Sequence, residues 1–550
     1  MRNRVLKVHP EDNIIVALQD LAQGEEISMD RLEIQLAEDI PAKHKFAERD
    51  FEEGATIIMY GVKVGEATQP ILKGGRIRTE NVIHASNEFK ISDSIPKWKA
   101  PDVSRFQGRT FQGFHRANGK VGTRNYWLVI PLVFCENRNI KVIREAMLEK
   151  LGYAINQDFS VGIDVLISQY QQGASEEDIL QTEIIRTREE ITRSRLFPQV
   201  DGIKFLTHEG GCGGTRQDSE ALCRLLAGYI THPNVAGATV LSLGCQNAQI
   251  QMLEKSVTGM DASFDKPLYI LEQQNSHSEQ AFVGEAIKKT FVGLMEANKV
   301  QRAPAPLSCL SLGLECGGSD GFSGISANPA LGYASDLLVA LGGKAILAEF
   351  PELNGVEQDL INRCTHREEA EKFSHLMKTY AQRAKEAGSG FDMNPSPGNI
   401  KDGLITDAMK SAGAAKKGGT SPIVKVLDYT EQTDQPGLHL LCTPGNDVES
   451  TTALAGSGAN LIVFTTGLGT PTGNAITPTI KMASNTRLAQ KMSDLIDIDA
   501  GTIISGEDSI SSKGAELLEL LIKVASGEII TRAERLGQDD FIPWKRGVSL

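Results

Sequence analysis

The rhythm of apolar and polar positions changes twice along this chain of 550 residues. Over residues 1–88, short apolar stretches alternate with Gly, Pro, Asp or Asn turns, at a spacing of about ten residues. This pattern predicts a small all-β module. Residues 89–108 contain two prolines, many polar side chains and little periodicity. They are expected to form an extended linker.

Beyond the linker, continuous apolar runs alternate with stretches of helical spacing. The runs 125–135, 202–208 and 237–245 have the composition of strands buried on both faces, and 139–153 has helical spacing. This alternation predicts a parallel α/β domain over residues 109–305.

One segment of that domain, 153–200, is polar and charged and has helical spacing in its second half. We expect it to be an inserted amphipathic hairpin. The proline-containing segment 301–306 is expected to mark a domain boundary. After it the same alternation resumes and predicts a C-terminal α/β domain over residues 306–550, with its strands at 310–316, 344–349, 422–429, 438–445 and 460–467.

The net charge of −13 argues against nucleic acid or an anionic membrane as the main partner. No run of about 18 apolar residues predicts a membrane span, and the N-terminus lacks the apolar centre of a signal peptide. We therefore expect a cytoplasmic protein. The eight cysteines are spread widely along the chain, which predicts reduced thiols, most of them in the core, rather than a disulfide framework.

Six apolar runs end in turns that contain Gly or Pro together with a cysteine or polar side chains. The turns lie at Cys135, Cys212, Cys245, Cys316, Cys442 and residues 464–474. Ligands of parallel sheets bind outside the carboxyl ends of the strands, so these turns predict a site assembled from several loops. Each turn taken alone is equally well explained by ordinary turn and helix-cap chemistry. No dinucleotide, P-loop or nucleophile-elbow motif is present, so no nucleotide cofactor is expected.

A divalent metal ion is the expected cofactor of this site. Oxygen and imidazole ligands suit Mg, Mn or Fe(II), and the candidates on or near the turns are His208, Glu315, Asp320, Glu349, Glu352 and Asp447. An iron–sulfur cluster on Cys135, Cys212, Cys245 and Cys316 is the alternative, although no compact CxxC spacing supports it. In the β module, His9 and His44 lie on polar turns, so the module is predicted to close over the site of another domain.

The chain resembles the altronate and galactarate dehydratases. The resemblance spans nearly the whole chain and is closer to the altronate branch. Its motifs are RANGKVGTRN (116–125), LGCQN (243–247), LECGGSDGFSGISANP (314–329), NPSPGN (394–399), TPGND (443–447), GTPTGN (469–474) and DIDAGT (497–502). Segments 153–200 and 207–214 depart from the family pattern.

The resemblance implies an N-terminal β-clip (SAF-like) module, a middle α/β domain and a C-terminal Rossmann-like domain without a nucleotide. It implies a cofactor that is Fe(II), with Mn(II) or Mg(II) as alternatives, and a homodimer or higher homo-oligomer. The implied reaction is dehydration of D-altronate to 2-dehydro-3-deoxy-D-gluconate. Galactarate or another hydroxy acid, including a sulfonated one, is the alternative substrate.

Site roles follow as hypotheses. The metal ligands are sought among Asp320, Asp447, Glu349, Cys316 and Cys245, and the acid and base among His208, Lys481, His9 and His44. The substrate is expected to contact Arg124, Asn125, Gly317, Gly318, Ser319, Asn399 and Thr470. Three of these residues have plain structural alternatives. Arg124 would form an ion pair at a domain junction, Lys481 would be a solvated charge at a helix end, and Asp320 would cap a helix or its own turn.

Overall fold

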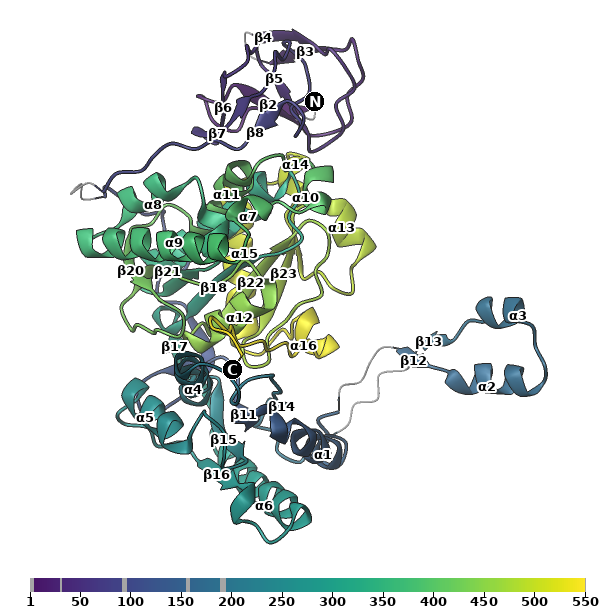
Figure 1. Ribbon diagram of the computed structural model, residues 1–550, viewed down its shortest axis with the longest axis vertical. Coiled ribbons are helices and arrows are strands. Elements are labelled where there is room, and N and C mark those ends of the chain that lie inside the picture. The colour runs from purple at the N-terminus through teal and green to yellow at the C-terminus, as the bar shows by residue number, and fades with distance from the viewer. Residues whose placement is uncertain (1–3, 30–31, 92–95, 155–158, 188–193, 550) are drawn as a thin grey trace.

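The computed structural model describes residues 4–29, 32–91, 96–154, 159–187 and 194–549. Figure 1 shows the N-terminal β module at one end, the middle domain at the other, and the C-terminal domain between them. In the part of the chain described, no helix is both long and apolar enough to cross a membrane.

The N-terminal module is all-β, as its apolar spacing predicts. Its eight short strands form three small sheets, β1-β2-β5, β3-β4 and β6-β7-β8. They are β1 Val5–Leu6, β2 Ile14–Ala17, β3 Glu26–Met29, β4 Leu32–Gln35, β5 Lys45–Ala47, β6 Thr56–Met59, β7 Val62–Ala67 and β8 Val82–Ile83. Turn residues end each strand, so a module of this size buries only short apolar stretches such as Ile14–Ala17.

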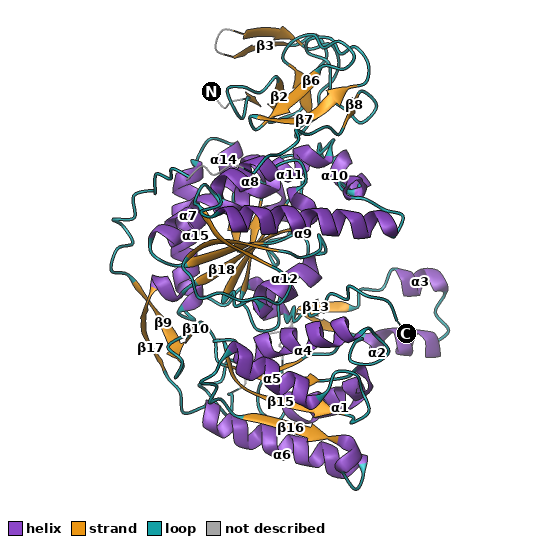
Figure 2. Ribbon diagram, turned by 60° about the vertical axis from the view of Figure 1, so that its left-hand side comes forward, coloured by secondary structure: helices purple, strands orange, loops and turns teal. Residues whose placement is uncertain are grey.

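The middle domain is built on a parallel sheet with the order β14-β11-β15-β16. The strands are β11 Tyr126–Pro131, β14 Gly202–Phe205, β15 Val235–Ser242 and β16 Leu268–Glu272. The helices that cover it are α1 Asn137–Leu148, α4 Arg216–Thr231, α5 Ile250–Met260 and α6 Glu279–Ala297 (Figure 2). Every residue of β11 and β15 is buried, which explains their continuous apolar runs.

Segment 301–306 forms a strand, where the sequence suggested only a boundary. Strand β17 Arg302–Pro306 pairs with β9 Thr110–His115, and β9 also pairs with β10 Val121–Gly122. Because β17 is an edge strand of this sheet, its prolines are tolerated there. The small sheet joins the start of the middle domain to its end.

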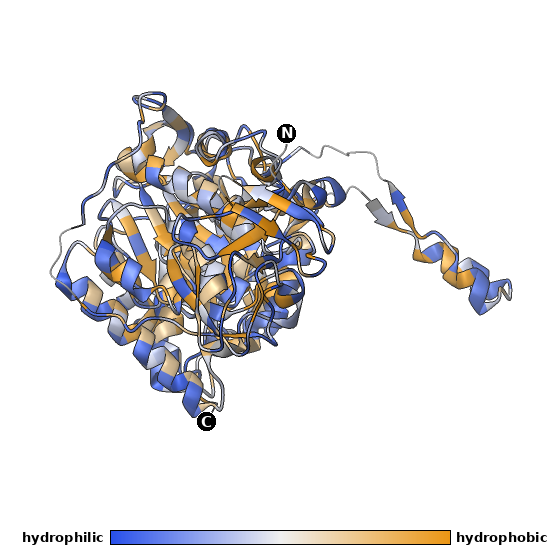
Figure 3. Cartoon of the chain, turned by 90° about the horizontal axis from the view of Figure 1, so that it is seen from above, coloured by the Kyte–Doolittle hydropathy of each residue, from blue (hydrophilic) through white to orange (hydrophobic). Residues whose placement is uncertain are grey.

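The inserted segment forms an arm that stands away from the body (Figure 1). It consists of β12 Phe159–Val161, α2 Ile163–Gln171, α3 Glu176–Leu180 and β13 Ile185–Thr187, with β12 and β13 antiparallel. The insertion is an excursion from the domain, as expected. Its predicted helical second half is helical at Glu176–Leu180, whereas residues 185–187 pair with the first strand and residues 188–193 lie outside the described residues. Apolar and polar segments alternate along the arm (Figure 3), and Tyr170 and Leu180 are exposed.

The C-terminal domain holds a seven-stranded parallel sheet with the order β20-β21-β19-β18-β22-β23-β24. Its strands are β18 Ser311–Cys316, β19 Lys344–Leu347, β20 Ile423–Leu427, β21 Gly437–Leu441, β22 Leu461–Thr466, β23 Thr479–Ala483 and β24 Ile498–Asp499. Its helices are α7 Ala327–Ala340, α8 Glu357–Arg363, α9 Arg367–Glu386, α10 Pro397–Lys401, α11 Asp407–Ala415, α12 Asp447–Gly456, α13 Thr486–Lys491, α14 Gly501–Ile504, α15 Ile510–Ala525 and α16 Arg532–Leu536.

Candidate active site

The strand order of the C-terminal sheet defines where a ligand is expected. The chain runs outward from β18 through β19 on one side, and later outward from β22 on the other side. The order therefore reverses between β18 and β22, and ligands of open α/β sheets bind at the carboxyl ends of the strands at that point. Strand β18 ends at Cys316 and β22 ends at Thr466.

Five side chains converge there, and we call them the acidic cluster: Glu315, Cys316, Glu349, Glu352 and Asp447. The first four are at most 4% exposed. The ligand atoms of Cys316, Glu349 and Glu352 all lie within 4.8 Å of one another, and those of Glu315, Glu349 and Asp447 do the same. So many carboxyl groups in one buried place require compensating positive charge.

The buried Lys417 and the partly buried Lys410 supply part of that charge. Lys417 Nζ lies 2.8 Å from both Cys316 Sγ and Glu349 Oε2. Lys410 Nζ, from α11, lies 2.5 Å from Glu352 Oε1 and also donates to Asn394 Oδ1 at 2.8 Å. Burial alone would lower the pKa of Lys417, but the surrounding acids raise it well above its usual value, so this lysine is a permanent cation.

The acids themselves are held in different protonation states. Burial, and then the charge of Glu349, raise the pKa of Glu315 well above its usual range. Burial, and then the charges of Glu349 and Glu352, raise the pKa of Asp447 to about 7. Burial also opposes ionisation of Glu352, but Lys410 and Lys417 outweigh it and lower that pKa. Pairs of groups whose pKa values are pushed apart are typical of acid–base sites.

Backbone strain marks the same place. Glu349 has a φ of 67°, in the left-handed region that a residue with a side chain rarely adopts. Its amide donates to Thr443 Oγ1 at 2.8 Å, which helps to hold this conformation. Such strain persists where the surrounding structure enforces it, and it concentrates at functional sites.

The Gly317–Gly318–Ser319 turn lies directly against the cluster. A Cβ atom on Gly317 would overlap the Asp447 carboxylate and would meet the Phe464 ring at 2.6 Å. The Gly317 amide donates to Thr465 O, which leaves the N–H groups of Gly318 and Ser319 as the candidates for binding an oxyanion. Two further predicted residues flank the turn. Asn399 Nδ2 donates to Ser319 O at 2.7 Å, and Thr470 Oγ1 lies beside Gly318.

Lys481 lies on buried strand β23 next to this turn, so the alternative of a solvated helix-end charge is wrong. Its Nζ donates to Thr470 O at 2.8 Å and lies 5.0 Å from the centre of the Phe464 ring. Burial lowers the pKa of Lys481 to about 8, against the opposing effect of Asp497, Asp540 and Asp447. A lysine of this kind is partly neutral near neutral pH and can act as a base.

Asp320 lies at the junction with the β module. One carboxylate oxygen accepts hydrogen bonds from Ser323 and Ser484, and the other lies 3.0 Å from Lys43 Nζ of the module. Lys43 also contacts Asp402 Oδ1 at 3.0 Å. Asp320 thus receives its partners from its own turn and from the module, and it belongs to neither group of potential ligands in the acidic cluster.

The two module histidines that were predicted to reach the site, His9 and His44, lie outside the acidic cluster. His44 Nε2 lies 3.1 Å from Lys401 O, and its Nδ1 lies 3.0 Å from Arg76 Nη2. Burial, and then the charge of Arg76, lower the pKa of His44 to about 4. His9 stays within its own module, where its ring packs against Gly61 and accepts from Glu11 N. Lys43 and the buried Lys45, whose Nζ donates to Gly403 O at 2.6 Å, are side chains by which the module approaches Asp320.

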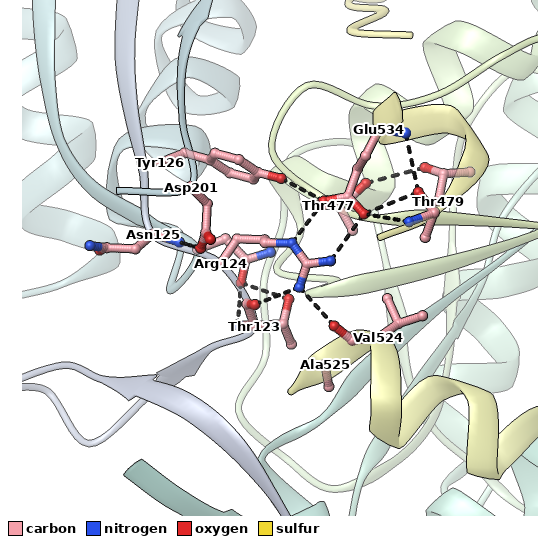
Figure 4. Close-up of polar contacts among 12 residues, drawn as sticks. Thr123, Arg124, Asn125, Tyr126, Asp201, Thr477, Thr479, Val524, Ala525 and Glu534 are labelled. Carbon is pink, nitrogen blue, oxygen red and sulfur yellow. Dashed lines mark hydrogen bonds and ion pairs between the residues drawn. The ribbon is translucent and has the colours of Figure 1, made fainter. Parts of the chain in front are cut away.

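Arg124 and Asn125 lie at the junction of the two α/β domains. Figure 4 shows the Arg124 guanidinium directed at Glu534, with Nε 2.7 Å from Oε1 and Nη2 3.0 Å from Oε2. Arg124 Nη1 donates to the carbonyls of Thr123 and Val524. The side-chain amide of Asn125 donates from Nδ2 to Gln199 O and Ala297 O. Arg124 therefore forms an ion pair at a domain junction, which is the structural role given above as the alternative to substrate binding.

His208 is buried in the middle domain, and both of its ring nitrogens are in contact with protein groups. Its Nε2 lies 2.8 Å from Pro131 O, and its Nδ1 accepts from Gly210 N at 3.0 Å. Burial lowers the pKa of His208 to about 4. The imidazole therefore stays neutral and holds the loop that follows β14.

The four cysteines considered as ligands of an iron–sulfur cluster lie in two different places. Cys316 belongs to the acidic cluster, whereas Cys245 lies in the middle domain with Cys135 and Cys212, and all three of these are exposed. Cys442 is buried, as are Cys223 and Cys364. All eight thiols are free.

No pattern in the sequence indicates that Lys410 and Lys417 belong to the site. Lys410 lies in a helix rich in small residues, and Lys417 in a Lys–Lys–Gly turn, neither of which follows an apolar strand. Tertiary packing brings both beneath the carboxyl ends of β18 and β19. Glu315 and Glu352, by contrast, are among the metal-ligand candidates that the sequence offers, and both lie in the acidic cluster.

The chemistry of the donor set fits a divalent cation. Glu315 Oε1 and Glu349 Oε1 are buried and accept no hydrogen bond within the described residues. If all four carboxylates ionise, Lys410 and Lys417 neutralise two of them and leave the charge that one divalent cation would balance. Carboxylate oxygens are the preferred ligands of Mg, Mn and Fe(II).

The fold and this site define an enzyme with a buried acid–base centre at the reversal point of a parallel α/β sheet. Three family descriptions match the chain in order. They are the altronate/galactarate dehydratase SAF domain at residues 3–85, the second domain of D-galactarate dehydratase/altronate hydrolase at 113–298, and the D-galactarate/altronate dehydratase C-terminal domain at 307–549.

Full-length relatives with assigned names support the same family. The altronate dehydratases of Bacillus subtilis (strain 168) and Escherichia coli (strain K12) are each 33% identical to the chain, over 99% of both sequences. Galactarate dehydratase (L-threo-forming) of E. coli is 32% identical over 97% of this chain and 94% of its own. The chain therefore belongs to the altronate/galactarate dehydratase family, as its motifs predict. It is a hydro-lyase that dehydrates a sugar acid.

Proposed function

We propose that the substrate is D-altronate and the product 2-dehydro-3-deoxy-D-gluconate. The observation that carries the proposal is the acidic cluster beside a buried lysine whose pKa is about 8. Two full-length relatives named altronate dehydratase support this choice of substrate. Galactarate is the second candidate, because a relative named for it also matches nearly the whole chain.

Glu315, Glu349 and Asp447 are the proposed ligands of one divalent cation, with Fe(II) preferred over Mn(II) and Mg(II). Bound there, the cation would act as a Lewis acid toward the substrate carboxylate and the charge that develops on it. Lys410 and Lys417 add fixed positive charge beside it and favour binding of an anionic sugar acid. The N–H groups of Gly318 and Ser319 are positioned to orient the same carboxylate.

Lys481 is the proposed base. In its neutral form it takes the proton from C2, and the electron pair of that C–H bond forms the C2–C3 double bond. The 3-hydroxyl group leaves with a proton returned from the Lys481 ammonium, so that one molecule of water is released. The remaining enol rearranges to the 2-keto acid. His208 takes no part in this scheme because both of its nitrogens are engaged in the middle domain.

A direct assay tests the substrate and the metal together. The protein is purified without oxygen, stripped of metal and reconstituted separately with Fe(II), Mn(II) or Mg(II). Formation of 2-keto acid is then followed from D-altronate and from galactarate. Iron-dependent product from altronate supports the proposal. Product from galactarate alone would make galactarate the substrate. No product from either acid with any metal would exclude both candidate substrates. The expected homo-oligomer and cytoplasmic location stay predictions.

A further inference from the structure

A second group of potential ligands lies in the middle domain. Cys135 follows strand β11, Cys212 follows β14 and Cys245 follows β15, and all three are exposed. We call them the thiol cluster. In the sheet order β14-β11-β15-β16, the chain order reverses between β11 and β15. The thiol cluster therefore occupies the place in its own sheet that the acidic cluster occupies in the C-terminal sheet.

Backbone hydrogen bonds tie the three loops together. Phe134 N donates to Gly210 O at 3.0 Å, and Ala248 N donates to Gly211 O at 3.0 Å. Gly211 packs so tightly against the end of β11 that a Cβ atom there would meet Val133 Cα at 2.7 Å. The thiols are close enough for Cys212 and Cys245 to raise the pKa of Cys135, although burial raises it more. The arrangement is thus fixed by main-chain contacts, not by mobile surface loops.

Three helices begin directly after these loops. Helix α1 starts at Asn137, α4 at Arg216 and α5 at Ile250, with 12, 16 and 11 residues respectively. The N-terminal end of a helix carries partial positive charge and favours a nearby thiolate or other anion. Burial, and then the neighbouring thiols, raise the pKa of Cys135, so the helix ends act against that effect, and a bound metal would deprotonate the thiol.

The spacing of the thiols argues against a single metal ion. A tetrahedral zinc ion with Zn–S bonds of about 2.3 Å holds its sulfur ligands about 3.8 Å apart. Among the residues that the structure describes, the groups with all ligand atoms within 4.8 Å of one another are the two in the acidic cluster. The three cysteines are therefore spread more widely. An iron–sulfur cluster suits that spread, because it distributes its cysteine ligands over different iron atoms.

We propose that Cys135, Cys212 and Cys245 bind an iron–sulfur cluster in which one iron has no protein ligand. That iron faces solvent, where it can accept a hydroxyl or carboxylate oxygen of an acid substrate. Cys316, the fourth cysteine considered from the sequence, is excluded because it lies in the acidic cluster against Lys417 and Glu352. The proposal rests neither on the identity of the sugar acid nor on a cation in the acidic cluster.

The test measures the cluster itself. The full chain is purified without oxygen, its iron and acid-labile sulfide are quantified, and its visible absorption and dithionite-reduced EPR spectra are recorded. We expect on the order of four irons and four sulfides per chain. Cys135→Ser, Cys212→Ser and Cys245→Ser should each lose most of the iron and sulfide. Cys309→Ser, a half-buried thiol outside the thiol cluster, is the matched control and should keep them. Far-UV circular dichroism confirms folding of each variant.

Three results would overturn the proposal. They are iron without sulfide, zinc in place of iron, and unchanged iron and sulfide in all three serine variants. Glu349→Gln separates this proposal from the proposed function, because it should retain the spectra while turnover falls. If the spectra are present but neither altronate nor galactarate is converted, the substrate is wrong and the iron–sulfur site stands.

Discussion

At the scale of single residues, Lys481 is the side chain on which proton removal is proposed to depend. Lys481→Met should lower kcat by about 10²–10⁴-fold, the usual contribution of a general base. In the wild type, kcat/KM should rise as pH increases through about 8, because only the neutral amine accepts a proton. Initial rates across pH 6 to pH 10 measure both effects. Lys491→Met, at the end of α13, is the control and should leave kcat unchanged.

Glu349 is the member shared by both groups of ligand atoms in the acidic cluster. Glu349→Gln removes one negative charge and one cation ligand at almost constant volume, so affinity for the divalent cation should fall by roughly 10- to 100-fold. Calorimetric titration of the metal-free protein with Mn(II) measures this. Glu357→Gln removes another buried carboxylate, which accepts from Gly355 N, and should leave affinity unchanged. Equal affinity in both variants would remove Glu349 from the ligand set.

At the scale of elements, the close approach of the β18 turn to α12 makes Gly317 indispensable. Gly317→Ala would drive a methyl group into the Asp447 carboxylate and the Phe464 ring, neither of which can retreat from its packed surroundings. We expect a loss of about 1–3 kcal/mol in the free energy of unfolding, together with most of the activity. Gly398→Ala, where the nearest atom to the new Cβ would lie 3.9 Å away, is the control. Denaturant unfolding and turnover are measured for both variants, and equal losses in the two would show that the close contact at Gly317 is not the cause.

At the scale of the whole molecule, the Arg124–Glu534 pair joins the middle domain to α16. Arg124→Met leaves a buried carboxylate unpaired and should cost about 3–5 kcal/mol of stability, whereas the double variant with Glu534→Met should recover part of it. If Arg124 instead held the substrate, KM would rise while stability stayed constant. A double-mutant cycle of unfolding free energies, with KM for each variant, distinguishes the two roles.

The same pair predicts a dependence of stability on pH. Burial opposes ionisation of Glu534, but Arg124 outweighs it and lowers the pKa of Glu534 from its ordinary 4.5 to about 2. A depressed carboxyl pKa stabilises the fold above the ordinary value, and this contribution is lost as pH falls from about 4.5 toward 2. The difference in unfolding free energy between wild type and Glu534→Gln should shrink over that range. A difference that does not change with pH would show that Glu534 is not the titrating partner.

The sequence alone predicts most of the elements, the family, and the edge of the C-terminal sheet that carries the candidate site. Apolar periodicity depends only on neighbouring residues, so buried strands such as 125–135 and 310–316 and the turns that follow them could be read directly. The turns at Gly317, Glu349, Asp447 and Thr470 were identified in this way, because parallel strands place their carboxyl ends at one edge.

Only the tertiary structure decided which of these side chains meet. Lys410 and Lys417 follow no strand, yet packing of α11 and the turn after it brings them against the acids. Arg124 and His208 are residue types that are common in active sites, but Arg124 is hydrogen-bonded to Glu534 and His208 to main-chain groups. Contacts between residues hundreds of positions apart depend on how whole elements pack, which local patterns do not encode. The same packing places Cys316 in the acidic cluster, apart from Cys135, Cys212 and Cys245 of the middle domain.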